Sequence, residues 1–301
     1  MNLSTLLLPL LASLASGLSS HPAASTSPAP QAEARTVTFY HANGAKARTG
    51  QLQGGRRVGH WTAWRRNGEL DYEGSYEGYQ RVGAWVFYDR TGAKRSEGTF
   101  QRGVRHGEWT LYHANGSRQA VGKFIDGERD GLWRFWNDQR KPRRTITYLA
   151  GVRNGEFQEF DEDGKKTGQG DYKDDVRHGE WVTWFSNGRE ESRGVYEMGS
   201  RVGEWKTWFE NGRPESVGGY VEDKKHGPWK AFHDNGQPDF EGSFENEVQV
   251  GPWKLFWSNG QPKAVGSFEA GKWQGTWECW RRDGTKDDQR SGIYELGQRI
   301  G

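Results

Sequence analysis

The charged residues with the most regular spacing are arginines that recur every 24 residues. The row consists of Arg57, Arg81, Arg105, Arg129, Arg153, Arg177 and Arg201, and Lys225 continues it. If each 24-residue unit forms two strands, these side chains line one edge of a sheet at intervals of about 10 Å. Such a line suits anionic lipid headgroups or an acidic protein surface. The structural alternative is that each arginine stacks on the Trp of a neighbouring hairpin in a cation–π contact.

A second group of basic residues departs from the pattern that its neighbours follow. It consists of Arg140, Lys141, Arg143 and Arg144. Where other units have Asn-Gly, this one has Gln139-Arg140, and a glycine expected a few residues later is replaced by Ile146. The group is a candidate site for an anion or a protein partner. A drifted, solvent-exposed turn explains it equally well.

Aromatic rings recur with the same period, each two residues after a glycine. They are Trp61, Trp85, Trp109, Trp133, Phe157, Trp181, Trp205, Trp229, Trp253 and Trp277. Rows of rings suit glycan or choline ligands, because aromatic cages bind quaternary ammonium groups. Only 33% of the chain is hydrophobic, however, and 14% is aromatic. We therefore expect most of these rings to form the core, which leaves one face at most for a ligand.

No arrangement of residues points to an enzyme, a metal site or a cofactor site. Cys279 is the single cysteine, which excludes an intrachain disulfide and any CxxC site. His106 and His178 share a repeat position with Val58, so that position requires no imidazole chemistry. The chain contains no P-loop, Gly-x-Ser-x-Gly elbow or His-Glu-x-x-His motif. A net charge of +2 gives no case for nucleic-acid binding.

One repeat must position all of these residues. We count the glycine that opens each unit as position zero, so that the rings above are at position two. The units start at residues 59, 83, 107, 131, 155, 179, 203, 227, 251 and 275. Most have a second ring at position five, Asn-Gly or Asp-Gly at positions eight and nine, glycine at position fifteen and Tyr or Phe at position seventeen.

This pattern predicts a β-hairpin in every unit. Asn-Gly supplies two residues that tolerate positive φ, as tight hairpin turns require, and the flanking segments are rich in strand-forming residues. Positions two and five are an odd number of residues apart. Their rings should point to opposite faces of the sheet, unless the glycine at position zero opens a β-bulge.

The predicted fold is all-β: an elongated, solenoid-like ribbon of about eleven consecutive antiparallel β-hairpins. A lone hairpin is unstable in water, so stacking of neighbours must bury the rings. We expect the repeat domain to span residues 35–301, with residues 35–58 as an N-terminal capping repeat. In that repeat Arg35 and Val37 replace the usual glycine and tryptophan. About 22 strands give a ribbon on the order of 100 Å long.

The first 34 residues differ in composition from the rest of the chain. Residues 1–20 contain an apolar stretch followed by small residues, which predicts a secretory signal peptide, with an n-region that lacks Lys and Arg. An uncleaved anchor or an apolar start without function are the alternatives. Residues 21–34 are rich in Pro, Ala and Ser, as in a flexible linker. We therefore expect a secreted protein, or one located in the periplasm or cell envelope.

The pattern G-x-W-x-x-[WFY]-x-x-N-G-x5-G-x-[YF]-x-x-G-x-R-x-G resembles the MORN repeat, in the variant found in many bacterial multi-repeat proteins. The resemblance covers essentially all of residues 35–301. It implies a single-layer antiparallel sheet that acts as a protein scaffold or dimerisation module. Some MORN arrays have been linked to phospholipid binding. Many bacterial relatives of the variant carry an antitoxin label, and an antitoxin-like role implies a protein partner.

Taken together, these observations predict a non-enzymatic protein-binding or scaffolding module in the cell envelope or outside the cell. The alternative is binding of glycan, choline or an anionic phospholipid surface through the aromatic rows or the arginine row. We expect no metal, cofactor or nucleic acid. The oligomeric state, the face that binds and the identity of the partner stay open.

The assignment of position two to the core predicts the effect of one truncation. Trp181→Ala should cost about 3–5 kcal/mol of local stability, whatever the ligand is, because it leaves a large cavity. Urea or thermal unfolding measures the change. A variant that melts like the wild type would show that position two is not part of the core.

Overall fold

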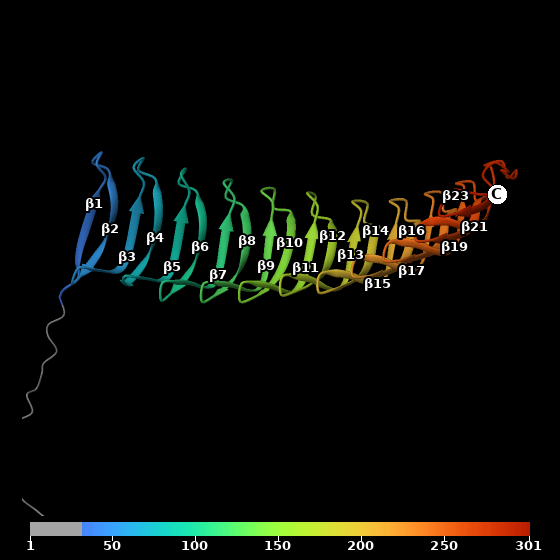
Figure 1. The fold of residues 1–301 in the computed structure, drawn as a ribbon. Helices are drawn as coiled ribbons and strands as arrows, with labels where there is room; N and C mark the ends of the chain where they lie inside the picture. The colour runs from blue at the N-terminus through green and yellow to red at the C-terminus, as the bar shows by residue number, and fades with distance from the viewer. Residues whose placement is uncertain (1–31) are drawn as a thin grey trace, which may run out of the picture.

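The computed structural model describes residues 32–301. The predicted signal peptide at residues 1–20 and most of the predicted linker at residues 21–34 lie outside the described residues. The described chain forms one open sheet of 23 strands and no helix (Figure 1). The prediction of an all-β ribbon of consecutive antiparallel hairpins is therefore confirmed.

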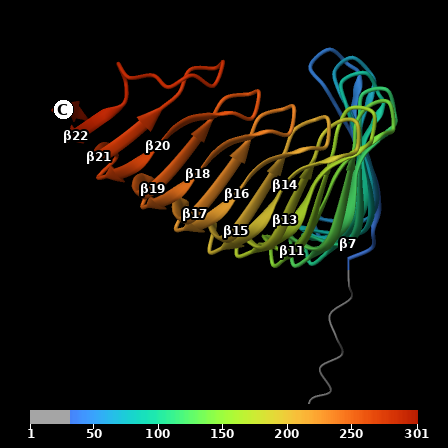
Figure 2. The ribbon, with the colours of Figure 1, turned by 90° about the vertical axis from the view of Figure 1, so that its right-hand side faces the viewer.

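The first strand starts at the residue where the repeat pattern begins, and each strand pairs with the one before it and the one after it. The strands are β1 (Arg35–Tyr40), β2 (Lys46–Gln53), β3 (Arg56–Trp64), β4 (Leu70–Gly78), β5 (Gln80–Tyr88), β6 (Lys94–Gln101), β7 (Val104–Tyr112), β8 (Arg118–Ile125), β9 (Glu128–Trp136), β10 (Pro142–Leu149), β11 (Val152–Phe160), β12 (Lys166–Lys173), β13 (Val176–Trp184), β14 (Glu190–Glu197), β15 (Ser200–Trp208), β16 (Pro214–Val221), β17 (Lys224–Phe232), β18 (Pro238–Glu245), β19 (Val248–Phe256), β20 (Pro262–Glu269), β21 (Lys272–Cys279), β22 (Gly292–Glu295) and β23 (Gln298–Arg299). The strands are bent, and the hairpins change direction along the ribbon as the sheet twists (Figures 1 and 2).

Each tryptophan at position two lies over the glycine at position fifteen of the preceding strand. Trp85, for example, pairs in register with Gly74, and a Cβ added to Gly74 would overlap the indole. The same overlap occurs at Gly50, Gly74, Gly98, Gly122, Gly170, Gly194, Gly218, Gly242 and Gly266. The indole thus fills the space that a side chain would occupy at the position of the glycine. This contact joins each hairpin to the next.

A β-bulge places the indole. Gly74 pairs with Trp85 and Ser75 with Val82, so Gly83 and Ala84 have no partner on β4. Gly83 adopts a φ of +65°, a conformation that costs glycine little. At the bulge the indole N–H of Trp85 donates to the carbonyl of Ser75 at 3.2 Å. The bulge that the sequence left open as an exception to strand alternation is therefore present, but it precedes position two and leaves the alternation between positions two and five unchanged.

The equivalent indole hydrogen bond recurs along the ribbon. The donors are Trp109, Trp133, Trp181, Trp205, Trp229, Trp253 and Trp277, at 3.0 to 3.2 Å. Trp61 lies over Gly50 of the predicted capping repeat, and its indole nitrogen is buried without a hydrogen-bond partner.

The repeat that starts at residue 131 keeps the packing with different residues. Ile146 replaces the glycine at position fifteen, and Phe157 replaces the tryptophan that would lie over it. The two residues pair in register between β10 and β11, and both are buried. A smaller ring makes room for the added side chain, so the two changes compensate for each other.

The Asn-Gly turns differ from the prediction. Only the glycine takes a positive φ, for example +80° at Gly116. The N–H of Gly116 donates to the carbonyl of His113 at 2.9 Å, and the N–H of His113 donates to the carbonyl of Ser117 at 2.8 Å. This is a type I turn followed by a glycine in the αL conformation, not a two-residue turn that needs positive φ twice. The two-residue turns lie at the other end of the hairpins, as at Arg102 (+50°) and Gly103 (+84°).

The asparagine of these turns also connects neighbouring repeats. The Asn115 side-chain amide accepts from the N–H of Ser117 at 2.9 Å and donates to the carbonyl of Asp138 in the next turn at 2.8 Å. Asn187, Asn211 and Asn259 repeat both bonds. Asparagine at position eight therefore acts between repeats as well as within its own turn.

The packing of tryptophan on glycine predicts opposite outcomes for two substitutions in the same strand. Gly170→Ala in β12 should destabilise the protein by about 1–3 kcal/mol or more, because the new Cβ overlaps the ring of Trp181. Gly168→Ala is the matched control, since its Cβ would lie 3.6 Å from the Cβ of Glu159 at ordinary contact distance. Urea unfolding compares the two. Equal stability losses would contradict the role given to position fifteen.

Candidate functional site

The two faces of the sheet carry different rings. Tyr72 packs against Trp85 with ring centroids 5.5 Å apart, whereas the next residue, Glu73, accepts a hydrogen bond from the hydroxyl of Tyr88 at 2.9 Å. Trp85 at position two and Tyr88 at position five therefore point to opposite faces, as their odd spacing predicts. We call the face that carries position two the Trp face.

The rings at position two are core residues. All ten are between 0% and 8% exposed. They alternate along the Trp face with the rings at position seventeen, and edge contacts such as Trp85 on Tyr76, at 5.0 Å, join the two rows. Rings buried to this extent are not available to a glycan or choline ligand.

The arginine row lies on the Trp face rather than along an edge of the ribbon. The guanidinium carbon of Arg81 is 4.8 Å from the ring centroid of Trp85, and Arg105, Arg129 and Arg177 lie 4.4 to 4.6 Å from Trp109, Trp133 and Trp181. The predicted cation–π stacking is present. The tryptophan, however, belongs to the same strand as the arginine and not to a neighbouring hairpin.

Towards the C-terminus, residues of the row contact acidic partners. Arg153 pairs with Asp175 at 2.8 Å, and Arg201 pairs with Asp223 at 3.0 Å. Lys225 donates its main-chain N–H to the carboxylate of Glu247 at 2.9 Å. The three acidic residues stand in two-residue turns, where other repeats have glycine. The hydrogen bond from Arg153 holds the pKa of Asp175 below its usual value.

Further towards the N-terminus the row has no such partners. Among residues 32–301, Arg81, Arg105 and Arg129 form no ion pair with an acidic side chain. Burial lowers the pKa of Arg105, and the positive charges of Arg129, Arg95 and Arg81 lower it further. Positive charge on this part of the Trp face is therefore uncompensated.

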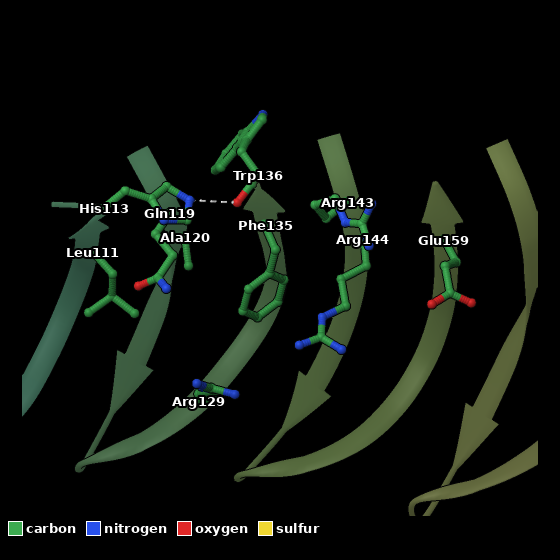
Figure 3. Close-up of a pocket in the computed structure, with 10 residues that line it drawn as sticks. All are labelled: Leu111, His113, Gln119, Ala120, Arg129, Phe135, Trp136, Arg143, Arg144 and Glu159. Carbon is green, nitrogen blue, oxygen red and sulfur yellow. Dashed lines mark hydrogen bonds between the residues drawn. The ribbon is translucent and has the colours of Figure 1, made fainter. Parts of the chain in front are cut away.

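A hollow of about 440 Å³ lies at the end of this part of the row (Figure 3). The ring of Phe135 lies between Arg129 and Arg144, whose guanidinium carbons are 5.8 and 5.0 Å from its centroid. Arg143 and His113 also line the hollow, which is bounded by Leu111, Gln119, Ala120, Trp136 and Glu159. Two cations on one ring form a site for an anionic group.

The structure divides the second basic group. Arg143 and Arg144 join Arg129 at the hollow, whereas Arg140 and Lys141 do not line it. Arg140 takes the place of the turn glycine with a φ of +67°, and Lys141 lies 3.8 Å from Asp163 in the next turn. Only half of the group therefore belongs to the candidate site.

The sequence analysis missed the residues at position four. Phe87, Leu111 and Phe135 at this position lie on the Trp face beside the unpaired arginines. The same position holds Glu159, Thr183 and Thr207 in the three repeats that follow. Aligning the units at position four reveals this change from apolar to polar in the sequence itself.

Among the described residues, no three His, Cys, Asp or Glu side chains are grouped as a metal site would need. Within the same residues, no helix has the length and hydrophobicity to cross a membrane.

The face opposite the Trp face supports a prediction about pH. Burial, with hydrogen bonds to Glu73 and Glu97, raises the pKa of both Tyr88 and Tyr112 to about 12. Because both values exceed the unfolded value of about 10, this stabilisation is complete below pH 10 and is lost as the pH rises towards 12. Tyrosinate absorbance should show Tyr88 and Tyr112 among the late-titrating groups. Glu73→Gln should lower the pKa of Tyr88 and leave that of Tyr112 unchanged, whereas Glu97→Gln should lower the pKa of Tyr112 and, through the lost negative charge, that of Tyr88 as well. No change in the late-titrating absorbance in either variant would contradict these contacts.

Comparison with known proteins identifies the repeat. A family model described as a MORN repeat variant matches residues 105–126, 153–174, 225–246 and 249–270. No curated protein matches the chain. Among solved structures, a chain of the crystal structure of TcdB2-TccC3-TEV is 10% identical, with a TM-score of 0.17 over 86% of this chain and 16% of that one. A chain of the Photorhabdus luminescens Tc holotoxin pore with mutated TccC3 is 10% identical, with a TM-score of 0.18 over 87% and 16%.

This protein thus spans about a sixth of the length of those toxin chains. The four family matches each begin at position 22, in register with the 24-residue period and with the arginine row. Four repeats of this chain therefore match the MORN repeat variant.

Proposed function

We propose that this chain is a non-enzymatic repeat protein that binds another protein along its ribbon and acts as a scaffold. The observation that carries the proposal is the series of depressions along the Trp face, lined by residues of successive repeats. A surface that continues over many strands fits an elongated macromolecular partner better than a small substrate, which usually binds in one enclosed cleft.

The candidate ligands differ in what the Trp face offers them. Glycan and choline lose support, because the tryptophans that would form their cages are buried and the arginines cover them. An anionic phospholipid surface is the second candidate, since Arg81, Arg105 and Arg129 carry charge without acidic partners. The apolar residues between these arginines favour a protein.

The proposed location is the cell envelope or the exterior of the cell. It rests on the composition of residues 1–20 alone. An antitoxin-like role inside the cell would require a different location, so fractionation of the source cells distinguishes the two.

Affinity capture tests the proposal. The full chain is immobilised, exposed separately to envelope and soluble extracts of the source cells, and washed at low and high salt. Mass spectrometry should identify one protein in near-stoichiometric amount from the envelope extract. The control is the destabilised variant Trp181→Ala, which should retain less of it. Recovery of lipid or polysaccharide without protein would overturn the proposal.

A further inference from the structure

Two independent properties of the Trp face change at the same place along the ribbon. Within the described chain Arg81, Arg105 and Arg129 have no acidic partner, while from β11 onward Arg153 and Arg201 pair with aspartates. Arg177 between them has no acidic partner there either and, like Arg129, donates to a tyrosine hydroxyl, that of Tyr196 at 3.0 Å. Position four is apolar up to Phe135 in β9, polar in the next three repeats at Glu159, Thr183 and Thr207, and apolar again at Ala231 and Leu255. Positive charge and apolar surface therefore coincide over β5 to β10.

We define the basic stretch as the residues of β5 to β10 that share both properties. It consists of Arg81, Arg105, Arg129, Arg143 and Arg144 with Phe87, Leu111 and Phe135. Glu159 lines the hollow at its end, together with Arg129 and Arg144, and Glu191 and Glu215 line a depression beyond it. An acidic ligand would be attracted to the basic stretch and repelled past β11.

The arginines of the basic stretch are held in place but keep free donors. The guanidinium carbons of Arg81 and Arg105 lie over the rings of Trp85 and Trp109, at 4.8 and 4.6 Å from the centroids. Stacking leaves the N–H groups at the edge of a guanidinium free to bind carboxylates in pairs. Arg129 uses one donor on the hydroxyl of Tyr148, at 3.2 Å. A ligand would meet cations whose positions are fixed before it arrives.

The spacing of the row fits one kind of chain. Successive arginines are two strands apart, which is about 10 Å. In a β-strand, residues three apart point to opposite sides, but a segment in the polyproline II conformation advances about 3.1 Å per residue with three residues per turn, so every third side chain falls opposite an arginine. The residues between them would meet Phe87, Leu111 and Phe135, on which apolar side chains can pack.

We infer that the basic stretch binds an acidic segment of a partner protein in the extended polyproline II conformation, with carboxylates at about every third residue and apolar side chains between them. The inference rests on the proposed protein-binding function and adds the chemistry of the partner. A bilayer is less suited to this site, because Arg81 and Arg129 are half-buried against the rings of the sheet. A single chain reaches them more easily than a flat layer of headgroups.

Fluorescence anisotropy with synthetic peptides tests the inference. The probe is a labelled peptide of about thirteen residues with glutamate at every third position and Leu and Ala between, long enough to pass four arginines. The full chain should bind it at low salt, with an affinity that falls as salt is added. Peptides with glutamine in place of glutamate, or with all glutamates grouped at one end, should bind at least about tenfold more weakly.

Paired variants locate the site. Arg105→Gln with Arg129→Gln should weaken binding of the glutamate peptide by about tenfold or more. The matched control is Arg153→Gln with Arg201→Gln, which removes two arginines of the same row that already have acidic partners. It should change the affinity by less than about twofold. Thermal melts confirm that both variants are folded, and Arg105→Lys with Arg129→Lys should restore part of the affinity if folding is intact.

Three results would overturn the inference: equal binding of the glutamine peptide, equal losses in both arginine pairs, or binding to phosphatidylserine vesicles without binding to the peptide. Capture from cell extract separates this inference from the proposed function. A partner retained equally by the wild type and by Arg105→Gln with Arg129→Gln would leave the proposed function standing and reject the basic stretch. If the peptide binds but no partner is captured, the basic stretch stands as a peptide-binding site and the proposed function is rejected.

Discussion

The structure depends on the contact between a tryptophan and a glycine on neighbouring strands. The sheet has one layer, so no second sheet or helix covers its core in the described part of the chain. Each indole at position two instead fills the space above a residue that lacks a side chain, and, except in Trp61, its N–H binds a carbonyl beside a bulge. The contact thus buries a large ring and pairs its polar atom within the sheet. The compensating pair Ile146 and Phe157 shows that the shared volume matters more than either residue type.

This contact also determines what the arginine row can do. The guanidinium groups over Trp85, Trp109 and Trp133 cover these rings from solvent, and the repeat places successive cations in one row. The two parts of the ribbon differ in whether this positive charge is compensated. Towards the C-terminus, an acidic residue in the two-residue turn of the next repeat pairs with the arginine, as Asp175 does with Arg153. Over β5 to β10 the turns have no such residue on the row, and the charge is left for a ligand.

The same repeat therefore serves two purposes along one ribbon. Positions two, fifteen and seventeen vary little because they build the sheet. Position four, and the turn residue that lies beside the arginine at position twenty-two, can change without disturbing the sheet. A solenoid can change its surface locally in this way, since each repeat contacts only its neighbours. The hollow around Phe135 lies where the repeats change character, between apolar and polar residues at position four.

The sequence by itself determined the period, the all-β class, the consecutive hairpins and the buried rings at position two. These features follow from local patterns that ten units repeat, and strand alternation alone separates positions two and five. Only the tertiary structure decided which turns need two positive φ values, which tryptophan each arginine covers and which arginines lack an acidic partner. Those outcomes depend on contacts between residues of adjacent repeats, such as Arg153 with Asp175, and no single unit contains both members of the pair.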